Sequence, residues 1–199
     1  GLGTGMIGGG MLIPLGAVFN DVVLGAGNAG FGTILVTMGI GVASGVSVLS
    51  AVQRRLDKER IFVASIFGAG ICLLVAVTSS NTLLTLSGVF AMGICAGSVY
   101  VLGFTLLHEH VEEQLRGRVF SALYTLVRFC LLLSITVGGF LSDGFHWFFG
   151  VVFDNEIAVG SWTMALPGVR GALWLASSFM LVAAALAWIS LRAPQKKSP

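Results

Sequence analysis

Six long apolar segments dominate this sequence and constrain its fold more than any other feature. Each is about as long as the 20 or so residues that a helix needs to cross the hydrocarbon core of a bilayer. Short polar or glycine-containing breaks separate them. We expect transmembrane helices over residues 2–19, 29–52, 61–78, 82–107, 119–141 and 171–191. The sequence therefore predicts an all-α membrane protein, with one bundle over residues 1–192 and a short tail or linker over residues 193–199.

Charged side chains are too few to cover a surface in water. They make up 10% of the chain, against about 25% in soluble domains, which excludes an ordinary soluble enzyme, a disordered chain and a nucleic-acid binder. Cys72, Cys95 and Cys130 each lie alone inside an apolar run, so we expect neither a disulfide framework nor a zinc site. No phosphate loop, dinucleotide fingerprint or hydrolase triad is convincing, so we expect no enzymatic activity and no cofactor.

The basic residues predict an orientation. Nine of the eleven lie in residues 53–60, residues 108–118 and residues 192–199, which six alternating helices place on one side. The positive-inside rule makes that side cytoplasmic. Both ends of the chain are then cytoplasmic, and the opposite loops carry only Arg170. The cytoplasmic loops include Arg54, Arg55, Arg60, Arg116 and Arg118.

Aromatic residues agree with this orientation. Trp147, Trp162 and Trp174 cluster at the predicted outer end and Trp188 near the inner end, as in the aromatic belts of membrane proteins, although random scatter is the other reading. The outer loop, residues 142–170, contains an aromatic run over residues 145–153 that is too short to span. We expect this run to lie in the interface or to pack over the mouth of a cavity.

Glycines recur at a spacing of four in three predicted helices, which is typical of closely packed membrane helices. Such rows serve either static packing or surfaces that move against each other. The rows are Gly1, Gly5 and Gly9; Gly41 and Gly45; and Gly93 and Gly97. Between the third and fourth helices we expect a tight turn over residues 79–81, with Asn81 able to cap the fourth helix.

Arg128 is the most informative polar residue. It lies ten residues after Arg118, about 15 Å into the fifth helix, near the midplane of a core about 30 Å thick. An arginine there costs roughly 2.5–3.5 kcal/mol on insertion scales. Ser121, Tyr124 and Thr125 share its helical face, and none of the acidic residues lies mid-membrane. We therefore favour a cavity-lining role in which Arg128 meets substrate or gates the pathway; the alternative is a structural arginine that snorkels or bonds carbonyls.

Other polar residues give weaker signals. We take Thr37 of the second helix and Tyr100 of the fourth as further cavity candidates, although hydroxyl groups often bond their own backbone in membrane helices. The histidines and glutamates of residues 108–113 predict a solvated loop and no metal site. Because no Asp, Glu or His lies mid-membrane, any proton coupling has to be supplied elsewhere.

Six apolar helices, a basic loop after the second and the run Leu-Arg-Gly-Arg-Val-Phe over residues 115–120 resemble the major facilitator superfamily. More narrowly, the chain resembles the C-terminal half of a bacterial drug or siderophore exporter. The family's basic loop (Gly, three residues, Asp-Arg, then Gly-Arg-Arg) is degenerate here. Arg54, Arg55 and Arg60 keep its charge, but its aspartate and glycine are out of register, so a gating role for this loop is an open expectation.

The resemblance implies a 3+3 inverted repeat that pairs residues 2–78 with residues 82–191. It also implies alternating access for a small solute, with export as the direction, in the cell membrane. The first, second, fourth and fifth helices would line the cavity. Since the sequence does not start with methionine, we expect an upstream segment, and the partner would be a missing N-terminal six-helix half or a second copy.

A narrower similarity points to a different function. Residues 106–133 and 165–170 resemble actinobacterial transporters that are fused to a thymidylate kinase. The alternative function is therefore a membrane anchor or scaffold for a fused or associated cytoplasmic enzyme such as a nucleotide kinase. In either case the lipid bilayer is a partner, and we expect no nucleic acid.

Overall fold

The computed structural model describes residues 15–25, 27–52, 57–111, 115–153, 156–159, 162–165 and 168–192. Residues 15–22 are helical. The labelled elements are α2 (Gly27–Val52), α3 (Lys58–Thr78), α4 (Thr82–His110), α5 (Arg116–Phe153), β1 (Glu156–Val159), β2 (Trp162–Ala165) and α6 (Gly168–Arg192). Within the described ranges, α2 to α6 are long and apolar enough to cross a membrane. Helices occupy the second, third, fourth and sixth predicted spans, and their ends lie within about three residues of the predicted limits.

The first predicted span is only partly covered, because residues 2–14, with its glycine row, lie outside the described residues. The helix ends at residue 22, three residues after the predicted limit. Asn20 is buried rather than terminal, and its side-chain amide donates a hydrogen bond to the Gly27 carbonyl at 2.6 Å. The connection uses Gly25 and Gly27 at φ +61° and +58°, which glycine adopts without steric penalty.

The fifth helix is much longer than predicted. α5 has 38 residues, about 57 Å at 1.5 Å per residue, and it includes the aromatic run that we expected to lie separately in the interface. A single glycine, Gly144, does not stop the helix, and the start of α6 supports it: a Cβ atom on Gly168 would overlap the backbone of Ser142 and His146. Beyond α5 the strands β1 and β2 form an antiparallel hairpin that the sequence analysis did not anticipate.

The connection between α4 and α5 is shorter than the predicted loop over residues 108–118. Residues 108–110 form the last turn of α4, and residues 116–118 form the first turn of α5. The turn over residues 79–81 is confirmed. The side-chain oxygen of Asn81 accepts a hydrogen bond from the backbone N–H of Leu83 at 2.9 Å and caps α4 as predicted.

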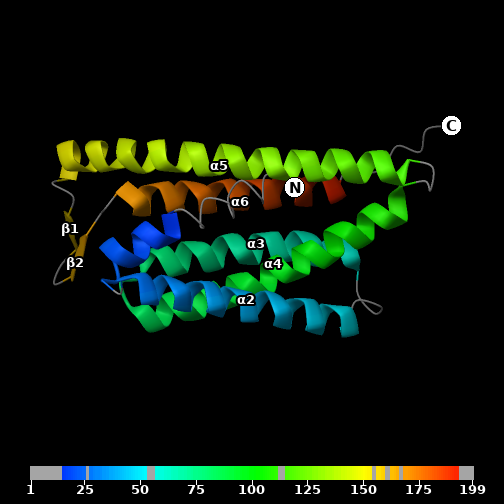
Figure 1. The fold of residues 1–199 in the computed structure, drawn as a ribbon, viewed down its shortest axis with the longest axis horizontal. Helices are drawn as coiled ribbons and strands as arrows, with labels where there is room; N and C mark the ends of the chain where they lie inside the picture. Colours follow the sequence, from blue (N-terminus) through cyan, green and yellow to red (C-terminus); the bar gives the residue numbers. More distant parts are fainter. Residues whose placement is uncertain are drawn as a thin grey trace.

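The helices pack in the order α2, α4, α3, α6 and α5, with α5 and α2 at opposite edges of the view (Figure 1). α4 crosses the bundle obliquely, from α2 at its start towards α5 at its end. The core joins residues 15–22, α3 and α6 through Leu15, Phe19, Leu73, Ala172 and Leu173. The end of α2, the end of α4 and the end of α6 lie at one end of the molecule, and the hairpin lies at the other (Figure 1). The alternating topology behind the orientation argument is thus present.

Two of the predicted glycine rows form the contact between α2 and α4. A Cβ atom on Gly93 would lie 2.6 Å from the Met38 carbonyl oxygen and 3.1 Å from the Gly41 Cα, and one on Gly45 or Gly97 would overlap the backbone of the opposite helix. Backbones this close leave no room for a side chain. The rows over Gly41–Gly45 and Gly93–Gly97 therefore account for the packing of these two helices.

Arg170 corrects the sequence analysis, which counted it as an outer-loop charge. It lies in the first turn of α6 and has no exposed surface. Its Nε donates a hydrogen bond to the Val77 carbonyl at 3.1 Å, and Nη2 donates to the Ser80 hydroxyl at 2.8 Å. The last turn of α3 is thereby capped from another helix. The buried Thr85 of α4 acts in the same way, since its hydroxyl donates to the Ala76 carbonyl at 3.1 Å.

These contacts follow from the chemistry of helix ends. The last four carbonyls of a helix have no intrahelical partner, and in a bilayer no water replaces the missing donors. A cation is also favourable at a helix C-terminus because of the helix dipole. Trp174 extends the contact, since its indole N–H donates to the Thr78 hydroxyl at 3.1 Å. Trp174 thus joins α6 to α3. Its side chain, which we expected in the outer aromatic belt, is half-buried by this contact.

Candidate functional site

The polar face predicted on α5 lies on the surface of the bundle. Ser121, Tyr124, Thr125 and Arg128 are all exposed, whereas Cys130 and Ser134 on the opposite face are buried. α5 packs against α6, and the polar face lies opposite the buried Cys130 and Ser134 on this helix, with the Tyr124 ring beside Phe104 of α4. The face is therefore available to a second surface, to water or to lipid.

Two of the four polar groups are already partly satisfied within the helix. The Ser121 hydroxyl donates to the Arg118 carbonyl and the Thr125 hydroxyl to the Ser121 carbonyl, both at 2.9 Å. This is the backbone bonding that the sequence analysis gave as the alternative for such residues. Arg128 makes no hydrogen bond or ion pair with any residue that the structure describes. Its guanidinium and the Tyr124 hydroxyl remain the main groups of this face for contact with another molecule.

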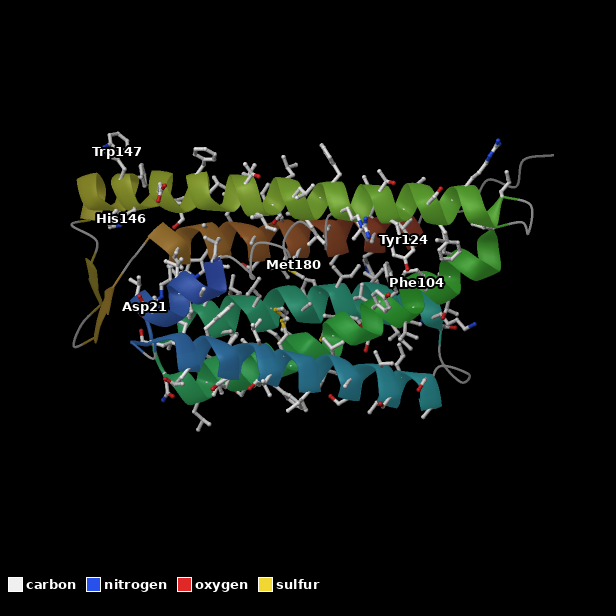
Figure 2. The ribbon with its side chains drawn as sticks, viewed as in Figure 1. Asp21, Phe104, Tyr124, His146, Trp147 and Met180 are labelled. Atoms are coloured by element: carbon white, nitrogen blue, oxygen red, sulfur yellow. The ribbon has the colours of Figure 1, made fainter. Side chains whose placement is uncertain are left out.

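Aromatic rings join α5 to the last third of α4. Phe104 lies between the two tyrosines, with ring centroids 4.7 Å from Tyr100 and 6.1 Å from Tyr124, and it stacks on Phe120 at 5.8 Å. Figure 2 shows Phe104 and Tyr124 facing each other where the two helices converge. Tyr100 and Tyr124 keep 52% and 51% of their surface exposed. The structure thus brings two predicted cavity residues into one cluster.

Phe104 and Phe120 were missed by the sequence analysis. Phe104 lies four residues after Tyr100 and so shares its helical face, which was a readable signal. Phe120 comes from the first turns of α5, and its stacking on α4 depends on the short connection between the two helices.

A groove of about 500 Å³ runs along α5 beside the polar face. Its lining residues are Ser121, Ala122, Thr125, Leu126 and Phe129. Because all five come from one helix, the groove is a shallow hollow: Ser121 and Thr125 lie on the edge next to Arg128, and Leu126 lies on the far edge, turned away from the polar face.

Thr37 is not brought to this site. It is half-buried on α2, which packs on α4 at the other edge of the bundle from α5. The neighbouring Thr33 and Ser44 donate to the Ala29 and Gly41 carbonyls of their own helix at 3.1 and 2.7 Å.

The predicted gating arginines lie at one end of the bundle, as far as they are described. Arg60, in the first turn of α3, pairs with Asp57 at 3.4 Å, and both side chains are more than 70% exposed, so the pair contributes little to stability. Arg118 is exposed at the start of α5, and Arg116 begins that helix. Arg54 and Arg55 lie outside the described residues.

No group of three or more His, Cys, Asp or Glu side chains within the described part could hold a metal ion. The cysteines at positions 72, 95 and 130 are free thiols.

Comparison with known proteins adds one result. The family model described as Major Facilitator Superfamily matches residues 1–153, which contain α2 to α5 and the whole polar face. No curated protein and no solved structure matches the chain.

Proposed function

The chain belongs to the major facilitator superfamily, a family of multi-pass secondary transporters, and we propose that it is the C-terminal six-helix half of such a transporter. Its partner is an N-terminal six-helix half or a second copy of this chain. The two halves rock against each other and expose a midplane site to each side in turn. The proposal includes a small solute as substrate, the cell membrane as location and export as the direction of transport.

The polar face of α5 is the observation that carries this proposal. Its three hydroxyl-bearing side chains and Arg128 are exposed along a helix whose apolar window covers residues 117–148. A face of this kind in contact with acyl chains would leave a guanidinium in hydrocarbon, at a cost of roughly 2.5–3.5 kcal/mol. A water-filled cavity between two halves removes that cost. We therefore assign this face to the transport pathway, with Arg128 near its centre.

The helix contacts support an inverted repeat of residues 2–78 and 82–191. In such a repeat the first helix corresponds to α4, α2 to α5 and α3 to α6. The contact of α3 with α4 therefore predicts a contact of α6 with the first helix. Both contacts exist: α3 packs on α4, and Leu15 and Phe19 join a core cluster with Ala172 and Leu173 of α6. The third helices of the two units, α3 and α6, pack directly on each other, which is compatible with a two-fold relation, but the packing of α5 on α6 has no comparable counterpart between α2 and α3.

In this proposal the end of the bundle that carries Arg60 and Arg118 faces the cytoplasm, and both termini lie on that side. Arg54 and Arg55 precede Arg60 in the chain, and Arg116 begins α5 two residues before Arg118. Their role is to meet the partner half when the cytoplasmic side closes, and the half-buried Thr37 of α2 would line the pathway further from Arg128.

Cysteine labelling tests whether this face meets water. Thr125 and Leu126 are adjacent, so they have the same depth in the membrane, but they point about 100° apart around α5, and both are exposed. Each is changed to cysteine in the full-length protein after replacement of the native cysteines by serine. Membranes are then treated with a charged, membrane-impermeant thiosulfonate, which reacts with thiolates in water and not with thiols held in lipid.

We expect modification of Thr125→Cys and no modification of Leu126→Cys. Equal protection of the two cysteines would mean that the polar face meets lipid or protein, and it would refute a pathway at this position. That outcome is the one expected for the anchor or scaffold function, which requires no water beside α5.

A further inference from the structure

The α4–α5 ring cluster offers flat aromatic surface rather than a closed core. Its four rings have centroid separations of 4.7, 5.8 and 6.1 Å around Phe104. Tyr100 and Tyr124, at the two sides, are each about half-exposed, with 52% and 51% of their surface accessible. Aromatic rings attract other rings in offset or edge-to-face arrangements at centroid distances of about 4.5–7 Å. A planar ring can therefore extend this cluster.

A positive charge stands one helical turn from the rings. Arg128 follows Tyr124 by four residues on the same face, about 6 Å along the helix axis, and its side chain is exposed. The nearest described carboxylate on α5 belongs to Asp143, which is fifteen residues and about 22 Å further along the axis. Asp21, Asp57 and Glu59 lie at helix ends, Glu109 is in the last turn of α4, five residues after Phe104, and Glu156 begins β1.

We propose that Tyr100, Phe104, Tyr124 and Arg128 form a binding site for a flat aromatic anion, such as an aromatic carboxylate. The inference rests on the proposed function, because it requires that this face line the pathway. The ligand ring lies against the tyrosine and phenylalanine rings. Its anionic group reaches one turn deeper to the guanidinium, whose planar fork matches two carboxylate oxygens.

The same residues disfavour other ligand classes. An organic cation would be attracted by the rings but repelled by the guanidinium of Arg128, whereas an anion is attracted by it. An aliphatic anion would bind Arg128 but leave the rings unused. The site therefore selects for a molecule that carries both an aromatic ring and a negative charge. This selectivity can be measured with probes that lack the ring or reverse the charge.

Protection of Thr125→Cys in the full-length protein provides the assay. Naphthalene-2-carboxylate is the test probe, cyclohexanecarboxylate lacks the aromatic ring, and a naphthylmethyl trimethylammonium salt reverses the charge. We expect naphthalene-2-carboxylate to slow modification at concentrations at least tenfold lower than either comparison compound. Equal protection by the two carboxylates, or stronger protection by the cation, would overturn the proposal.

Variants locate the probe. Arg128→Gln is expected to raise the concentration for half-protection at least tenfold, and Tyr100→Ala or Tyr124→Ala at least threefold, whereas Phe140→Leu on another face of α5 should change nothing. If Thr125→Cys is modified but no probe protects it, the pathway stands and the aromatic-anion site is refuted. If Thr125→Cys is not modified at all, the proposed function fails and this inference fails with it.

Discussion

Replacement of Arg170 by alanine should destabilise the bundle more than the loss of any exposed charge. The side chain has no accessible surface, and it ties the first turn of α6 to the last turn of α3 through Val77 and Ser80. Alanine removes these two hydrogen bonds and leaves the carbonyl of Val77, a residue only 2% exposed, without this donor. α3 and α6 lie between α4 and α5 in Figure 1, and their contact connects α2 and α4 to α5. Loss of the Arg170 hydrogen bonds therefore weakens a central contact of the bundle.

The size of the effect follows from these contacts. A hydrogen bond from a charged donor contributes about 1.5–3 kcal/mol in soluble proteins, and side-chain hydrogen bonds between membrane helices contribute about 0.6–1.7 kcal/mol. With two bonds and a buried stem, we expect a loss of about 2–4 kcal/mol. For a chain of this length 1 kcal/mol corresponds to about 2–4 °C, so the midpoint should fall by roughly 5–15 °C. Arg170→Lys keeps the charge beside the carbonyls of α3 but cannot reach both partners, and it should lose about half as much.

The measurement is thermal unfolding of the purified protein in detergent, followed by a thiol-reactive dye that reports exposure of Cys72, Cys95 and Cys130. Arg118→Ala, which removes an exposed arginine at the start of α5, is the matched control. A midpoint for Arg170→Ala within about 2 °C of that control would correspond to at most about 1 kcal/mol. That result would refute the view that Arg170 caps α3.

Three further predictions follow from the fold and the site. Gly93→Val should destabilise the protein by at least about 2 kcal/mol, because its Cβ would meet the α2 backbone, while Gly39→Ala, with open space around it, should be neutral or stabilising in the same thermal assay. Arg128→Ala should abolish or alter vesicle transport while insertion into the membrane is unchanged, and normal uptake or efflux by the variant would exclude a role in the pathway. In intact cells an impermeant thiol reagent should label Trp147→Cys and not Leu115→Cys, and the reverse pattern would invert the proposed orientation.

The sequence was sufficient for those features that depend on local composition. Apolar runs of spanning length predict helices because hydrocarbon admits few other structures, and α2, α3, α4 and α6 begin and end within about three residues of the predicted limits. The spacing of Gly93 and Gly97 likewise predicted a close helix contact, and the structure identifies α2 as the partner. Helical periodicity placed Ser121, Tyr124, Thr125 and Arg128 on one face, and that face is exposed.

Features that depend on contacts between distant segments were not readable. Arg170 was taken for a loop charge because its partners, Val77 and Ser80, lie about ninety residues away. One signal was available: a cation in the first turn of a helix opposes the helix dipole, so it needs a partner elsewhere. The length of α5 was missed for a related reason, since packing of Gly168 against Ser142 supports a helix that local sequence would allow to end.

Access to Thr125→Cys from both sides of the membrane is the most direct test of the central claim, that the α5 face around Arg128 lines an alternating-access pathway. Modification is measured in right-side-out and in inside-out vesicles with the same impermeant reagent, and with Leu126→Cys as the control at equal depth. The account predicts that Thr125→Cys is modified in both preparations and Leu126→Cys in neither. Modification in only one preparation would indicate a one-sided vestibule, and absence of modification in both would contradict a pathway at this face.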